Sequence, residues 1–143
     1  MEMPYRRILV PFDGSQGSWK ALRKALVLAG EQGAAITALS IEEHLPRYAA
    51  TVGEVQEEKE QENAYFAQLH AQAVALAREQ GLDIKTETLV GHAAQVIVRY
   101  AEEQEFDLIA IGHSGHSGVW GVLLGSTTAR VVDQAPCDVL VVR

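Results

Sequence analysis

The sequence predicts an α/β fold: a single three-layer domain in which helices cover both faces of a five-stranded parallel sheet. Short apolar runs alternate with longer stretches of helical period, which is typical of βαβ units. The chain has 143 residues, a length at which one domain buries roughly 70% of the surface of its unfolded chain. We therefore treat residues 1–143 as one domain that needs neither a disulfide nor a structural metal.

Five apolar runs qualify as strands. They cover residues 7–11 (RILVP), 35–41 (AITALSI), 84–90 (IKTETLV), 107–111 (DLIAI) and 138–143 (DVLVVR). The first and fourth are continuously apolar, as in strands covered on both faces, whereas the third alternates apolar and polar residues. The third strand is therefore expected at one edge and the fifth at the other, in the order 3-2-1-4-5.

Between the strands, apolar residues recur at the spacing of one buried helical face. The four sets are Trp19, Leu22, Leu26 and Ala29; Phe66, Leu69, Ala73 and Leu76; Ala93, Val96, Ile97, Tyr100 and Ala101; and Thr128, Val131, Val132 and Ala135, which Pro136 ends. Residues 44–61 have no such periodicity and include a charge-rich stretch. We expect a solvated loop that runs into an exposed first helical turn there, with a mobile flap over a ligand as the alternative.

The composition of the chain limits which binding partners and which cellular compartment we expect. The net charge of −7 opposes binding to a nucleic acid backbone. The lone cysteine, Cys137, cannot form an internal disulfide or a thiolate metal cluster, which fits a reducing compartment. We interpret Cys137 as a small buried apolar residue. No segment approaches the ~20 apolar residues of a membrane span, and the first ten residues lack the apolar core of a signal peptide. We expect a cytoplasmic protein whose partners include neither nucleic acid nor membrane.

The fifth strand has the features of an interface. Residues 139–142, from Val139 to Val142, are apolar throughout and carry no proline or charge that would protect an exposed edge. A second copy of the chain is the simplest cover, so we expect a homodimer formed through this strand.

The loop after the fourth strand is rich in glycine. In an open parallel sheet, ligands bind beyond the carboxyl ends of the strands, where the strand order reverses, which here means the loops after the first and fourth strands. We expect positive φ angles at Gly112 and Gly115, so that backbone N–H groups can approach an anion.

The end of the same loop predicts a second anion site. Gly125, Ser126 and Thr127 open the fourth helix, and Ser126 is the expected N-cap, with free N–H groups and the helix dipole behind it. Two anion sites suit a polyphosphate. The alternative is that the glycines only build a long surface turn and that Ser126 only caps a helix.

The spacing G-x2-G-x9-G-[ST], met by Gly112, Gly115, Gly125 and Ser126, resembles the ATP-binding signature of the universal stress protein family. The opening RRILVPFDGS, the segment DLIAIGHSG and the closing GSTTARVVDQAPCDVLVV resemble that family's first strand, fourth strand and last helix and strand, so the resemblance covers essentially the whole chain. It implies a Rossmann-like fold of the adenine nucleotide alpha hydrolase-like type. It also implies ATP as ligand, with Mg²⁺ or Mn²⁺ bridging the phosphates.

The resemblance assigns roles residue by residue. It implies that the phosphates lie on the loop residues Gly112, His113, Gly115, His116, Gly125, Ser126 and Thr127. It implies that Asp13 with Pro11 holds the nucleoside and that Ile41 lies against the adenine. The alternatives are that Asp13 only closes a turn and that Ile41 only packs in the core. One departure is that His113, His116 and Trp120 stand where many relatives carry Arg or Lys.

Other motifs in this loop do not support an enzyme. His113 to His116 spells HxGH, but it follows the fourth strand and has no KMSKS-like partner, so adenylyl transfer is not expected. His113 and His116 resemble a metal pair, but a zinc site needs three or four protein ligands, and the sequence supplies no further ones nearby. No P-loop and no GxSxG elbow occurs, so neither a P-loop ATPase nor an α/β-hydrolase is expected. His113 or His116 near a γ-phosphate could support slow hydrolysis, whereas two surface histidines without function are the alternative. No residue is assigned a catalytic role.

The leading hypothesis is a binding module: a homodimeric stress-response or signalling protein in which ATP occupancy changes the surface offered to partners. A slow ATPase or autokinase is the second hypothesis. A nucleotide-free, chaperone-like stress dimer is the third.

Overall fold

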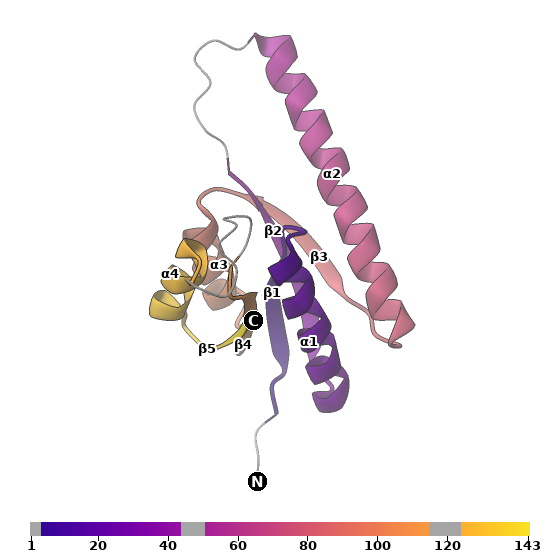
Figure 1. Cartoon of the computed structure of the whole chain (residues 1–143), viewed down its shortest axis with the longest axis vertical. Coiled ribbons are helices and arrows are strands. Elements are labelled where there is room, and N and C mark those ends of the chain that lie inside the picture. The colour runs from indigo at the N-terminus through magenta and orange to yellow at the C-terminus, as the bar shows by residue number, and fades with distance from the viewer. Residues whose placement is uncertain (1–3, 44–50, 115–123) are drawn as a thin grey trace.

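The computed structural model describes residues 4–43, 51–114 and 124–143. In these ranges strands and helices alternate along the chain. The elements are β1 (Arg7–Pro11), α1 (Gln16–Gln32), β2 (Ala35–Glu42), α2 (Val52–Glu79), β3 (Lys85–Val90), α3 (Ala93–Glu103), β4 (Leu108–Gly112), α4 (Ser126–Gln134) and β5 (Asp138–Val142). The strands are parallel and lie in the order β3-β2-β1-β4-β5 (Figure 1), which confirms the predicted fold class and strand order.

The helices cover the two faces of the sheet in pairs (Figure 1). Ile8 of β1 belongs to a buried cluster with side chains of α1 and α2. The next residue, Leu9, points to the opposite face and belongs to a second cluster with side chains of α3 and α4. This alternation, applied to a strand that is apolar throughout, produces the three layers that the sequence predicts.

Within residues 44–61 the sequence predicts a loop that runs into an exposed first helical turn; the exposed helical start is confirmed, but α2 begins already at Val52 and has several exposed turns. The helix begins at Val52, where the hydroxyl of Thr51 accepts from the amide of Glu54 and the carboxylate of Glu54 accepts from the amide of Thr51. This capping box starts a segment of good helix formers. Most side chains of the first three turns are exposed, so no apolar periodicity marks them. Residues 44–50, where the flap hypothesis falls, lie outside the described residues.

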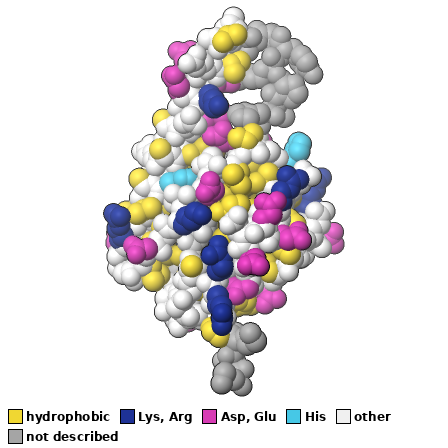
Figure 2. All heavy atoms as spheres, turned by 180° about the vertical axis from the view of Figure 1, so that it is seen from behind, with side chains coloured by type: hydrophobic (Ala, Val, Ile, Leu, Met, Phe, Trp, Pro, Cys, Tyr) yellow, Lys and Arg dark blue, Asp and Glu magenta, His cyan; other side chains and the backbone are white. Residues whose placement is uncertain are grey.

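The described surface mixes the two signs of charge. On the face shown in Figure 2, lysine and arginine side chains are interspersed with aspartate and glutamate. None of the helices in the described ranges is long and apolar enough to cross a membrane.

Candidate nucleotide-binding site

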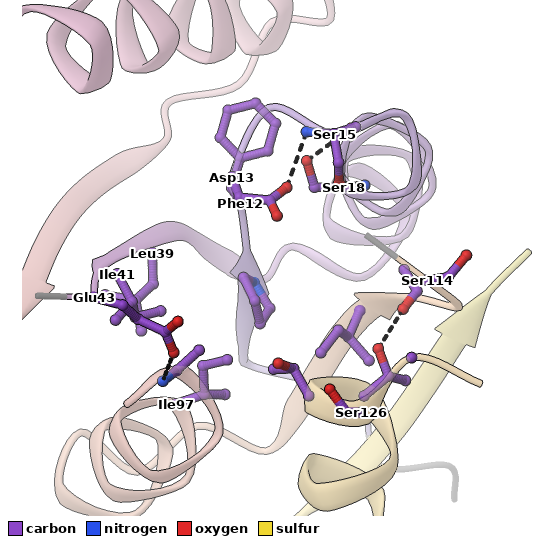
Figure 3. Close-up of a pocket in the computed structure, with 17 residues that line it drawn as sticks. Phe12, Asp13, Ser15, Ser18, Leu39, Ile41, Glu43, Ile97, Ser114 and Ser126 are labelled. Carbon is purple, nitrogen blue, oxygen red and sulfur yellow. Dashed lines mark hydrogen bonds between the residues drawn. The ribbon is translucent and has the colours of Figure 1, made fainter. Parts of the chain in front are cut away.

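A cavity of about 450 Å³ opens at the carboxyl ends of β1, β2 and β4 (Figure 3). The loop after β1, the end of β2 and the N-termini of α3 and α4 form its walls. The predicted site residues that line it are Pro11, Asp13, Ile41, Gly112, Gly125, Ser126 and Thr127. His113 does not line it, and Gly115 and His116 lie outside the described residues. The topology thus brings the loops after the first and fourth strands to one place.

The loop after β1 is held by a short series of hydrogen bonds. The amide of Ser15 donates to Oδ1 of Asp13 over 2.9 Å, and the hydroxyl of Ser15 accepts from the amide of Ser18 as the N-cap of α1. Gly14 between them has φ 82°, a conformation that favours glycine. Asp13 therefore does close a turn, and it also lines the cavity.

Helix α2 supports this loop from the outside. The hydroxyl of Tyr65 donates to the carbonyl oxygen of Asp13 over 2.9 Å. The hydroxyl of Ser40 donates to the carbonyl of Phe12 and lies 2.8 Å from Nε2 of His70. Burial lowers the pKa of His70, which keeps the ring neutral at neutral pH, and Nε2 then carries the proton that Ser40 accepts. The position of α2 is thereby tied to the backbone of residues 12 and 13.

Gly112 is required for a different reason from the predicted one. It is absent from the residues with positive φ in the described chain, so the expected backbone conformation is wrong for Gly112. A Cβ at this position would lie 2.7 Å from the backbone carbon of Gly17 and 2.8 Å from its carbonyl oxygen. The end of β4 and the start of α1 therefore approach as closely as two glycine backbones allow.

The N-terminus of α4 also differs from expectation. Gly125, with φ −58° and ψ 148°, is the N-cap, and Ser126 is already the first helical residue, so the prediction of Ser126 as N-cap is wrong. No side-chain hydrogen bond caps this helix, and its first turn has no acidic residue. The amide of Gly125 donates to the carbonyl of His113 over 2.9 Å, and the hydroxyl of Thr128 donates to the carbonyl of Gly112 over 2.7 Å. The start of α4 is thus fixed against the end of β4, and its N-cap, Gly125, has no side chain that could bond the first amides of the helix.

Two buried polar side chains follow β4. His113 is 6% exposed and Ser114 is 2% exposed. Within the part of the chain that the structure describes, neither Nδ1 of His113 nor Oγ of Ser114 has a hydrogen-bond partner. The interpretation of His113 as a surface residue is therefore wrong. Ser114 lines the cavity, where an unpaired hydroxyl is suited to a polar ligand.

Glu43 and Ser114 are cavity residues that the sequence reasoning missed. Oε1 of Glu43, which follows β2, accepts from the amide of Ala93 at the start of α3 over 2.8 Å. Nothing local in the sequence indicates this contact, because the two residues are far apart in the chain. For Ser114 the signal was present, since the residue lies inside the glycine loop itself. Ile41 meets both of its interpretations: it packs against the cluster beneath α3 and α4 and also lines the cavity.

Two further features concern possible metal ligands and the lone cysteine. In the described ranges no group of three or more His, Cys, Asp or Glu residues could hold a metal ion. Cys137 is partly buried against the cluster beneath α3 and α4, and burial raises the pKa of its thiol. The sequence predicts a small buried apolar residue; Cys137 packs as an apolar residue but is only partly buried.

Comparison with known proteins agrees with this architecture. The sequence profile of the universal stress protein family matches residues 4–143. A universal stress protein of Methanocaldococcus jannaschii is 34% identical over 146 residues, covering 97% of this chain and 82% of that protein. The structure of universal stress protein UspA from Lactobacillus plantarum matches with a TM-score of 0.89 and 32% identity, over 99% of this chain and 100% of that one. The crystal structure of a universal stress protein in complex with cAMP matches with a TM-score of 0.76 and 27% identity, over 99% of each chain.

Proposed function

Because the chain belongs to the universal stress protein family, we propose that it binds ATP in the cavity at the carboxyl ends of β1, β2 and β4 and acts as a nucleotide-dependent stress-response or signalling module. The observation that carries the proposal is the composition of this cavity. It combines an apolar side with the uncapped N-terminus of a helix. That combination suits a ligand with a flat apolar base at one end and phosphates at the other.

The proposed orientation follows from the two sides of the cavity. Leu39, Ile41 and Ile97 lie on one side, and Ser114 and Ser126 lie on the other (Figure 3). The base would pack on the apolar side, and the phosphates would accept from the first amides of α4. Hydroxyl groups, including the unpaired one of Ser114, would add donors there.

The relative solved with cAMP supports an adenine nucleotide as the class of ligand. ATP differs in having three phosphates, which is why we propose Mg²⁺ or Mn²⁺ bridging them. The described part of the chain offers no set of three ligands of its own, so the phosphates would hold such an ion.

We further propose that the protein is a cytoplasmic homodimer joined through β5. This strand is at the edge of the sheet, and its three central residues are only partly buried. No strand in the described ranges pairs with its outer side.

The test of nucleotide binding is purification without added nucleotide, denaturation, and ion-pair chromatography of the released small molecules. We expect ATP in the supernatant. For nucleotide-free protein, ATP at 100 times its Kd should add about 2.7 kcal/mol of stability. The midpoint of thermal unfolding should then rise by roughly 5 to 10 °C.

Other results would point elsewhere. Recovered ADP with continuing release of phosphate would favour a slow ATPase. No recovered nucleotide, together with an unchanged midpoint in millimolar ATP, AMP and cAMP, would contradict the proposal and favour a nucleotide-free stress dimer.

A further inference from the structure

We infer that Glu43 determines which base the cavity accepts: its carboxylate selects a base with an exocyclic amino group at the rim of the apolar side. The inference rests on the proposed function and goes beyond it, because it assigns base selection to one side chain. Glu43 is exposed and follows β2, and it lines the cavity together with Leu39 and Ile41 of that strand.

Among the described residues, Glu43 makes one hydrogen bond that involves a single oxygen of its carboxylate. Oε1 accepts from the amide of Ala93, the first residue of α3, over 2.8 Å (Figure 3). The N-cap of α3, His92, makes no side-chain cap hydrogen bond. Glu43, which follows β2, therefore supplies the acceptor for the first amide of this helix. This bond holds the carboxyl group through one oxygen, and because Glu43 lines the cavity, the second oxygen, Oε2, is the one that a ligand there would meet.

The same bond orients the whole ligand. A carboxylate occupies the positive end of α3, whereas the first turn of α4 has no acidic residue. Phosphates are repelled from Glu43 and attracted to α4, so the base is left beside Leu39, Ile41 and Ile97. The cavity therefore has one orientation for a nucleotide.

A carboxylate accepts hydrogen bonds and cannot donate them. Adenine presents an amino group at position 6 of its ring, and hypoxanthine presents a carbonyl oxygen at the same position. Beside Oε2 of Glu43 the amino group gains a hydrogen bond, and the carbonyl oxygen meets a second acceptor. When a bound base covers this acceptor, a base that lacks the matching donor leaves it unpaired and binds less tightly.

The experiment compares the Kd of ATP with the Kd of ITP by calorimetry, for the wild type and for Glu43→Gln. Glutamine keeps one oxygen to accept from the amide of Ala93 and replaces the second oxygen with an NH₂ donor. We expect the wild type to bind ATP at least tenfold more tightly than ITP. In Glu43→Gln the ratio should fall to about threefold or less, with weaker ATP and tighter ITP binding.

Two further variants serve as controls. Glu43→Asp keeps the acceptor character and should retain a preference for ATP, which also covers a Glu43→Gln protein that folds poorly. Glu31→Gln removes the same charge from an exposed position near the end of α1, and should leave the ratio at its wild-type value.

An unchanged tenfold preference in Glu43→Gln, or an equal loss of preference in Glu31→Gln, would overturn the role of Glu43 while leaving ATP binding intact. A wild-type protein that binds neither nucleotide would overturn the proposed function, and this inference with it. The two failures are therefore distinguishable.

Discussion

Replacement of Ser126 with aspartate should weaken ATP binding by about a hundredfold or more, while the free protein remains at least as stable as the wild type. Ser126 is the first residue of α4 and lines the cavity. Two unit charges 4 Å apart repel by about 4 kcal/mol at the effective dielectric constant near a protein surface. Half of that is enough for roughly a thirtyfold loss, and a triphosphate brings more than one charge.

The opposite effect on stability makes this variant diagnostic. The first turn of α4 has no acidic residue, and a carboxylate at a helix N-terminus typically adds about 0.3–1 kcal/mol. Ser126→Asn, of similar size and without charge, is the matched control. Calorimetry with ATP and thermal unfolding without it should move in opposite directions for Ser126→Asp. If Ser126→Asp and Ser126→Asn bind ATP with equal affinity, the phosphates do not lie at the N-terminus of α4.

Proline at Val141 should convert the proposed dimer into monomers. The amide of His113, after β4, donates to the carbonyl of Val142 over 2.8 Å. Successive residues of a strand direct their backbone groups to opposite sides, so the N–H of Val141 points away from β4, to the open edge. Proline removes that donor from the edge and spares the β4–β5 ladder.

Light scattering measures the mass of this variant. Val141→Ala, which keeps the N–H and loses only side-chain contact, is the control and should remain dimeric or dissociate partially. If Val141→Pro has the mass of the wild-type dimer, then β5 is not the interface. A wild-type protein that is itself monomeric would refute the homodimer outright.

The sheet could be predicted from the sequence because its strands are marked by local composition. β1 has its predicted bounds, β2, β3 and β5 differ from theirs by one residue at one end, and β4 is shifted by one residue at both ends. An exposed first turn of α2 was predicted, but its start at Val52 and its further exposed turns were missed because an exposed helix has no apolar face to detect. The signal that could have found its start was the pair Thr51 and Glu54, which has the spacing of a capping box.

The location of the cavity could be predicted from the sequence, whereas only some of the contacts around it could. The rule that ligands bind where the strand order reverses located the loops after β1 and β4. The structural reason for Gly112 is a collision with the backbone of Gly17, and that contact depends on how α1 packs against β4. The contact of Glu43 with Ala93 likewise exists only once β2 and α3 are placed side by side. A local sequence pattern cannot predict either of these two contacts.

The most direct test of ATP binding in this cavity is a titration of ATP into nucleotide-free, ¹⁵N-labelled protein, followed by amide NMR. We expect saturable shifts that are largest for Asp13, Ser126 and Thr127, which line the cavity. The amides of Gly33 and Gly81, beyond the C-terminal ends of α1 and α2, should not move. If millimolar ATP leaves the cavity amides unshifted, or shifts a different set, the cavity is not an ATP site.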